Sequence, residues 1–123
     1  MQQLSTISTT LKTNNDIKNI INDFENKKTI VLNNFQDLKY NVIKKILLDF
    51  VQFIKDINAQ KYNANWFITT MLAVAIAYVL SMFKSSQNTK SLTNIINGIF
   101  AIKMIHSVIK DEFNNWKTIR SNI

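Results

Sequence analysis

Residues 66–83 form a run of eighteen positions without a charged residue, and Lys84 closes it. At about 1.5 Å of rise per residue, a helix of this length covers roughly 27 Å, close to the ~30 Å hydrocarbon core of a bilayer. A chain of 123 residues offers little protein with which to enclose so long an uncharged helix. The pattern therefore predicts one transmembrane helix over about residues 65–84.

Aromatic and basic side chains stand at both ends of this run. Tyr62 precedes it and Trp66 opens it, while Phe83 and Lys84 lie at its far end. Amphipathic rings favour the headgroup region of a bilayer, and long lysine side chains extend into that region. We expect these four residues to lie at the membrane interface.

Small residues recur at intervals of four along the same helix and form one ridge: Thr69, Ala73, Ala77 and Ser81. In lipid there is no hydrophobic force between helices, so close backbone approach across small side chains is what favours their association. The ridge therefore predicts a packing surface for a partner helix.

Before this run, apolar residues recur at intervals of three and four from Ile17 to Ile57, as on one face of a helix. The pattern predicts a long amphipathic helix over about residues 15–59, forming an extramembrane unit over residues 15–60. Polar residues at 27–29 and 33–34 are the points where this helix could divide into two. A flexible polar N-terminus is expected over residues 1–14. The polar face of the second half of the helix includes Asp49, Gln52, Lys55 and Asp56.

After the uncharged run, the polar segment 84–90 (KSSQNTK) predicts a connection, and Ser91 is a suitable cap for a helix over about residues 91–118. Asn63 or Asn65 is a suitable cap for the uncharged helix predicted over residues 65–84. The second half of the C-terminal helix has an apolar face that consists of Ile102, Ile105, Ile109, Phe113 and Trp116. Its polar face consists of Lys103, Ser107, Lys110, Asn114 and Lys117. We predict a C-terminal amphipathic helix.

Two alternatives to this arrangement remain open. The uncharged helix has the pattern of a central helix in a soluble bundle as well, because such a helix is also apolar on all sides. Residues Leu92–Ile109 could form a second span and complete a hairpin. That segment contains Lys103, however, and a central lysine costs about 2.5–3.5 kcal/mol on insertion scales.

The composition agrees with an all-α fold in a single structural unit. There is no proline, one glycine and no cysteine, so the turn residues that many short strands need are missing. Without cysteine, the chain has no disulfide and no thiolate metal ligand.

The net charge of +7 comes from fifteen Lys and Arg against eight Asp and Glu, and Arg120 is the one arginine. The lysines are dispersed and are not interleaved with aromatic residues, so the charge does not favour nucleic-acid binding. Abundant Asn, Ile and Lys are also typical of an AT-rich genome.

Candidate chemistry is sparse. His106 is the single histidine, and no acid or nucleophile is placed beside it by helical spacing. No acidic pair recurs with metal-ligand spacing, and one glycine cannot build a phosphate-binding loop. We therefore expect no enzyme activity, no cofactor, no metal site and no small-molecule substrate.

These features predict a non-catalytic accessory or assembly subunit of a larger membrane protein complex. Its partners would be other membrane protein subunits and the lipid bilayer, and small supernumerary subunits of organellar respiratory or ATP synthase complexes are of this type. That analogy favours the mitochondrial inner membrane. A pore-forming helical hairpin and a soluble helical-bundle interaction module are the alternative functions.

Overall fold

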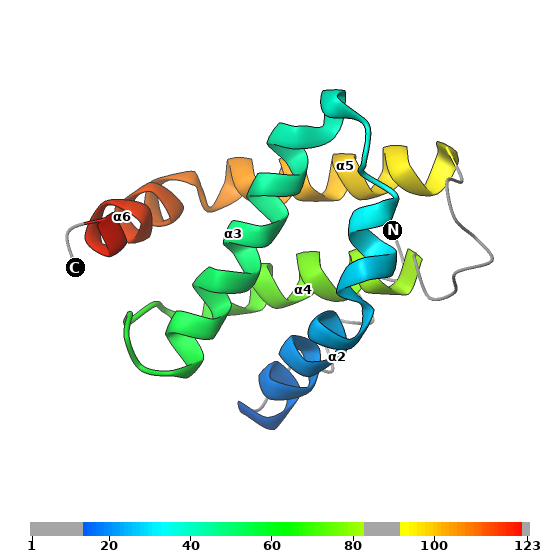
Figure 1. Ribbon diagram of the computed structural model, residues 1–123. Coiled ribbons are helices and arrows are strands. Elements are labelled where there is room, and N and C mark those ends of the chain that lie inside the picture. Colours follow the sequence, from blue (N-terminus) through cyan, green and yellow to red (C-terminus); the bar gives the residue numbers. More distant parts are fainter. Residues whose placement is uncertain (1–13, 83–91, 122–123) are drawn as a thin grey trace.

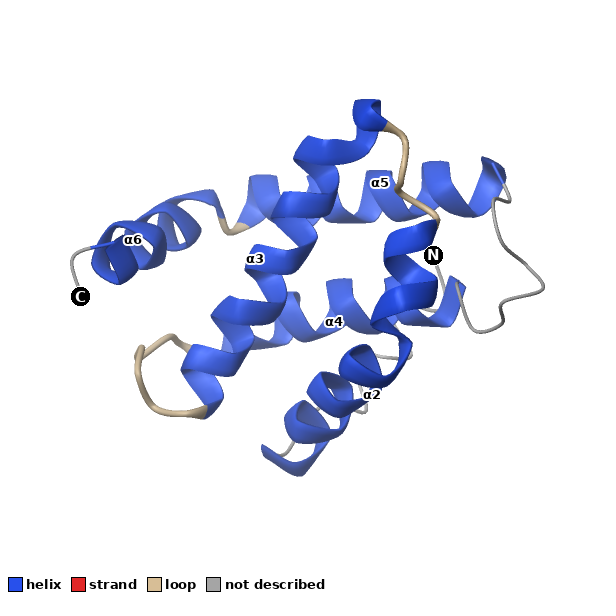
Figure 2. Cartoon of the chain, viewed as in Figure 1, coloured by secondary structure: helices blue, strands red, loops and turns tan. Residues whose placement is uncertain are grey.

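The computed structural model describes residues 14–82 and 92–121, and every regular element in these two ranges is a helix (Figure 2). The first elements are α2 (Asn14–Asn33), the short 3-10 helix η1 (Leu38–Tyr40) and α3 (Asn41–Asn58). They are followed by α4 (Trp66–Met82), α5 (Leu92–Val108) and α6 (Lys110–Ser121). The all-α fold class is therefore confirmed for the described residues.

The helices form two crossed layers (Figure 1). α4 and α5 run side by side in one layer, while α2 and α3 cross over them in the other. α4 contacts α2, α3 and α5, so it is the element around which these three helices pack.

The central position of α4 follows from its composition. It carries no charged side chain, and 11 of its 17 residues are buried. Leu72, Ile76 and Val79 are completely inaccessible to solvent. A helix that is apolar on all sides gains most from complete enclosure, because each buried apolar side chain contributes about 1.5–3 kcal/mol relative to exposure.

The predicted continuous helix over residues 15–59 is wrong, because the chain turns between α2 and α3. Asn34 donates from its side-chain amide to the Ile30 carbonyl oxygen at 2.8 Å, next to the end of α2. Phe35 then enters the core with no exposed surface and meets the Tyr40 ring edge-on at a centroid distance of 5.9 Å. The Asp37 side chain caps η1 by accepting from the Lys39 backbone N–H at 3.2 Å. The break lies at Asn33-Asn34, one of the points indicated by the sequence, and it lets both helices pack on α4.

The predicted single helix over residues 91–118 is also wrong, because the chain bends by 81° between α5 and α6. Ile109 lies at the bend and is 1% exposed. The apolar face predicted for this segment is nevertheless buried throughout: Ile102, Ile105, Ile109, Phe113 and Trp116. The bend lets α6 continue that buried face against the end of α3.

The predicted break over residues 60–65 and one of its two candidate caps are confirmed. Asn65 accepts the Ile68 backbone N–H through its side-chain oxygen at 3.0 Å, which satisfies one of the free donors at the start of α4. The proposed cap Ser91, the connection at 84–90 and the predicted polar N-terminus up to residue 13 lie outside the described residues.

Within the described ranges, no single helix combines the length and the apolar composition of a membrane span. α5 and α6 have the necessary length and apolar composition when they are taken together, but the chain bends between them. α4 is apolar but shorter than a span requires. The membrane-spanning role of residues 65–84 therefore stays a prediction.

Candidate functional site

The outward side of α5 carries a stripe of large apolar residues that the described chain leaves uncovered. We call it the α5 outer face, and it consists of Leu92, Ile96, Phe100, Met104 and Val108. Their exposed fractions lie between 37% for Met104 and 64% for Leu92. Residues at intervals of four are neighbours on the surface of a helix, so the stripe is continuous over about 24 Å and is inclined to the helix axis.

The remaining exposed positions on this side of α5 are neutral or basic. Thr93, Asn97 and Ser107 lie between the apolar residues, and Lys103 is the single Lys, Arg, Asp or Glu of the helix. A face with five large apolar side chains and one cation resembles the interior of a helix bundle more than a solvated surface.

The inward side of α5 is equally apolar and is fully used by the fold. Ile95, Ala101, Ile102 and Ile105 are buried there, and the Asn94 side-chain amide donates to the Met82 carbonyl oxygen at the end of α4 at 3.2 Å. α5 is therefore apolar on both sides, yet the described residues cover only one of them.

The predicted helix-packing ridge on α4 lies inside the molecule. Thr69 and Ala73 are 9% and 1% exposed, and Ala77 and Ser81 are half-buried. The two hydroxyl groups bond along their own helix, from Thr69 to the Asn65 carbonyl at 3.3 Å and from Ser81 to the Tyr78 carbonyl at 2.7 Å. Another protein would have to displace this chain to reach Thr69 and Ala73, so a role of the ridge between subunits stays a prediction.

Two of the four predicted membrane-interface residues lie in the described part of the chain. Trp66 is 64% exposed at the first position of α4. Tyr62 is half-buried, and its hydroxyl group donates to the Glu112 carboxylate at 2.5 Å. Phe83 and Lys84 lie outside the described residues. Tyr62 therefore connects the turn before α4 to α6, a contact that the sequence did not reveal.

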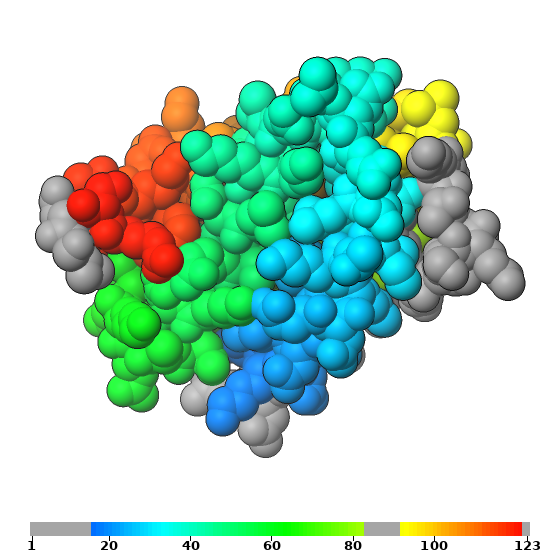
Figure 3. Space-filling model, in the orientation of Figure 1, coloured from blue at the N-terminus to red at the C-terminus, as the bar shows by residue number. Residues whose placement is uncertain are grey.

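A buried carboxylate holds α6 against α3. Asp56 is 6% exposed, and its Oδ2 atom accepts from Trp116 Nε1 at 2.9 Å and from Arg120 at 2.7 Å. Its Oδ1 atom accepts from the Gln52 amide at 2.9 Å. The space-filling view shows the red end of α6 beside the green end of α3 (Figure 3). We call Gln52, Asp56, Trp116 and Arg120 the α3–α6 junction.

Opposing effects act on the pKa of Asp56. Burial by itself raises this pKa, but hydrogen bonds from Trp116, Gln52 and Arg120, together with the guanidinium charge, outweigh it. The net pKa lies below the ordinary value, so the carboxylate is ionised near neutral pH. The sequence pattern placed Asp56 on the polar face of its helix. Helical periodicity does not show that this carboxylate meets the indole of Trp116 and the guanidinium group of Arg120.

His106 lies among aromatic rings, with a centroid distance of 6.5 Å to Phe50 and an edge-on contact of 5.1 Å to Phe113. Burial and the nearby cations Lys110 and Lys117 lower the pKa of His106, which favours the neutral imidazole. The residue therefore packs at the corner between α3, α5 and α6.

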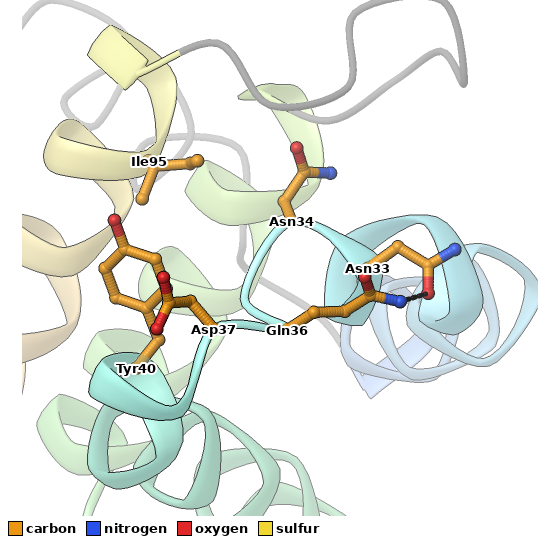
Figure 4. Close-up of a pocket in the computed structure, with 6 residues that line it drawn as sticks. All are labelled: Asn33, Asn34, Gln36, Asp37, Tyr40 and Ile95. Atoms are coloured by element: carbon orange, nitrogen blue, oxygen red, sulfur yellow. Dashed lines mark hydrogen bonds between the residues drawn. The ribbon is translucent and has the colours of Figure 1, made fainter.

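A polar depression follows the turn after α2 (Figure 4). Its lining comprises Asn33, Asn34, Gln36, Asp37, Tyr40 and Ile95. The amides serve the turn itself, since Gln36 donates to the Asn33 side chain at 3.1 Å. Asp37 caps η1, and Figure 4 shows Tyr40 directed toward Ile95 of α5. The polar side chains of this depression therefore bind to neighbouring residues of the turn, and their role is structural.

In the two described ranges, no three His, Cys, Asp or Glu side chains are grouped so that they could hold a metal ion. No protein-family model matches the chain, and no curated protein or solved structure matches it either. The features that bear on function are therefore the exposed apolar face of α5 and the contacts around α6.

Proposed function

We propose that the protein is a non-catalytic accessory subunit of a larger membrane protein complex, and that it binds an apolar helix of a partner subunit through the α5 outer face. The observation that carries this proposal is the exposure of Ile96, Phe100 and Val108, at 53%, 61% and 54%, on a helix whose opposite side is already buried in the core. Covering such side chains gains roughly 25 cal/mol per Å² of apolar surface removed from water.

The shape and charge of this face favour a helix as its partner. A helix docks on a neighbour through anchors at intervals of three and four, and the α5 outer face offers anchors at intervals of four over about 24 Å. The smaller side chains of Thr93, Asn97 and Ser107 lie between these anchors. Lys103 and Lys110 add positive charge without an acid between Leu92 and Lys110, so the partner helix should carry acidic residues beside its apolar stripe.

The location in a membrane complex is supported by composition. α4 is uncharged throughout, and α5 carries a single charged residue, Lys103. Such helices are typical of proteins that pack with other helices in or beside a bilayer. α4 could face lipid only if α2 and α3 moved away from it, so we propose that the chain is attached to the membrane complex through α5.

Alkaline carbonate extraction tests how the chain is attached to the membrane. A chain that is held there only by its partner protein is expected in the supernatant.

The proposal is tested by replacing Phe100 with a photo-crosslinking amino acid in the tagged chain in its native cells. Crosslinking followed by mass spectrometry should identify one membrane protein and map the contact to an apolar helical segment of it. The same amino acid at exposed Lys45 of α3 is the matched probe that should not reach this segment.

Charge substitutions provide the second part of the test. Ile96→Asp and Phe100→Asp should each abolish co-purification of that partner, because either places a carboxylate in the centre of the apolar contact. Asn114→Asp introduces the same charge on an exposed position of α6, outside the α5 outer face, and should leave co-purification unchanged. Equal co-purification of Phe100→Asp and the unmodified chain, with its helical content intact, would show that the α5 outer face is not the binding surface.

A further inference from the structure

A second surface feature lies at the α3–α6 junction and shares no residue with the α5 outer face. It is a depression of about 570 Å³ lined by Asp56, Lys61, Tyr62, Trp116, Ile119 and Arg120. These residues come from the end of α3, the turn after it and α6. Sites for small ligands commonly have volumes of about 300–1,000 Å³, so this depression has room for one.

Arg120 is held in position at the edge of this depression. Its guanidinium group donates to Asp56 at 2.7 Å and lies 5.9 Å from the centre of the Trp116 ring. The side chain is still 48% exposed, and its other guanidinium nitrogens make no hydrogen bond to the described residues. A guanidinium anchored through one nitrogen keeps further donors available for an oxyanion.

Lys61 supplies a second cation from the turn. It is exposed, and its ammonium group forms no ion pair with any residue in the described ranges. The turn that presents it is fixed by a hydrogen bond from the Lys61 backbone N–H to the Asp56 carbonyl oxygen at 2.8 Å. The two cations therefore approach the depression from separate elements.

The rest of the lining is largely apolar. Ile119 is 43% exposed, and the Tyr62 ring packs edge-on against Phe53 at a centroid distance of 5.3 Å. The Tyr62 hydroxyl group is engaged by Glu112 and Asn115, which leaves the ring as its contribution to the depression. The depression therefore has an apolar part, formed by Tyr62 and Ile119, and a cationic part, formed by Lys61 and Arg120.

The charges of the lining residues favour a ligand with a single negative charge. Lys61 and Arg120 are positive and Asp56 is negative, which leaves one positive charge. Asp56 lines the depression, but its carboxylate already accepts three hydrogen bonds, one of them from Arg120, so its charge is largely balanced within the junction. Glu112 is not part of the lining, and its carboxylate accepts the Tyr62 hydroxyl.

We infer that this depression binds an organic monocarboxylate, with the carboxylate between Lys61 and Arg120 and the apolar body against Tyr62 and Ile119. This inference goes beyond the proposed function and does not depend on it. Binding at the α3–α6 junction would be reported by the indole N–H of Trp116, which donates to Asp56.

The test uses the full-length chain labelled with nitrogen-15 and follows its two indole N–H signals by NMR. The variant Trp66→Phe assigns them, because Trp66 and Trp116 are the two tryptophans of the chain. Titration with 2-naphthoate should shift the Trp116 signal in a saturable way and leave the Trp66 signal in place. Acetate, which lacks the apolar body, and 2-naphthalenemethanol, which lacks the charge, should each bind at least about fivefold more weakly.

Matched lysine variants complete the test. Lys61→Gln should weaken 2-naphthoate binding by at least about fivefold, whereas Lys103→Gln removes the same charge from α5 and should leave the affinity unchanged. Equal affinities of these two variants would overturn the inference, as would equal shifts of both indole signals. If acetate bound as tightly as 2-naphthoate, the site would be one for simple anions and the inferred ligand class would be wrong. None of these outcomes bears on partner binding by α5, which is measured separately.

Discussion

At the scale of single residues, Gln60 is a non-glycine residue whose backbone has a positive φ. It has φ of 63°, in the left-handed region that favours glycine. Its N–H bonds to the Ile57 carbonyl at 3.0 Å, and the next N–H, that of Lys61, bonds to the Asp56 carbonyl at 2.8 Å. This pair of bonds is the Schellman arrangement that closes a helix, and glycine is its usual left-handed residue.

Replacement of Gln60 by glycine should therefore stabilise the protein. Gln60→Gly removes the Cβ that disfavours positive φ and should raise the free energy of unfolding by about 0.5–1 kcal/mol. Gln60→Val should lower it by a similar or larger amount, because a β-branched residue tolerates this region poorly. Urea denaturation followed by circular dichroism measures both changes. A Gln60→Gly variant that is less stable than the parent would contradict this account of the turn.

At the scale of elements, the turn between α2 and α3 decides how the first half of the chain packs. A continuous helix from α2 to α3 would carry Phe35 away from the core, whereas the turn buries it completely. The turn also brings Glu25 of α2 to Lys55 of α3, and these side chains form an ion pair. The two side chains are 36% and 41% exposed, and an ion pair at the surface contributes about 0–1 kcal/mol. Burial of the Phe35 ring therefore contributes more to the stability of this turn.

The buried ring should account for much of the stability of this turn. Phe35→Ala should lower the free energy of unfolding by about 3–5 kcal/mol, because it leaves a cavity beside Tyr40. Leu38→Ala is the matched control: Leu38 lies three residues further on and is 81% exposed. That control should change the free energy of unfolding by no more than about 0.5 kcal/mol. Equal effects in chemical denaturation would show that Phe35 is not enclosed as described.

At the scale of the whole molecule, ionisable groups at two places make the fold sensitive to acid. Asp56 has a lowered pKa, so its contribution is present above the ordinary value of 3.8 and is lost as the pH falls through the lowered value. His106 also has a lowered pKa, so the unfolded chain takes up the proton first as the pH falls below 6.5. Both groups contact α6, which should therefore loosen before the helices around α4.

A histidine variant separates the two effects. The free energy of unfolding of the parent protein should fall as the pH decreases from 6.5 toward the lowered pKa of His106. His106→Leu should reduce this loss, because an apolar side chain in contact with Phe50 and Phe113 takes up no proton. The loss at still lower pH should remain, because it belongs to the carboxylates with lowered pKa values, Asp56 and, through its hydrogen bond with Lys55, Glu25. Denaturation at a series of pH values measures both, and an unchanged profile in His106→Leu would contradict the role of the imidazole.

Periodicity in the sequence predicted the features that depend on neighbouring residues. The described part of the helix predicted over residues 65–84 is α4 (Trp66–Met82), and Asn65, one of its two candidate caps, caps it. The predicted face from Ile102 to Trp116 is buried. The exposed stripe on α5 also has a signal in the sequence, since that helix is apolar on both sides. Asp56 had no comparable signal, because its partners Trp116 and Arg120 lie 60 and 64 positions further along the chain.

The sequence by itself determined that the described residues are helical, offered candidate points for the breaks around residues 33–34 and 60–65, and identified the buried face from Ile102 to Trp116, because these depend on residue spacing and backbone preference. Only the tertiary structure decided that the uncharged helix α4 is enclosed by its own chain, that the helices turn at Asn34 and bend at Ile109, and that one face of α5 is left uncovered. Each of these features depends on which side chains, distant from one another in the sequence, pack together in one small core. Local periodicity carries no information about that choice.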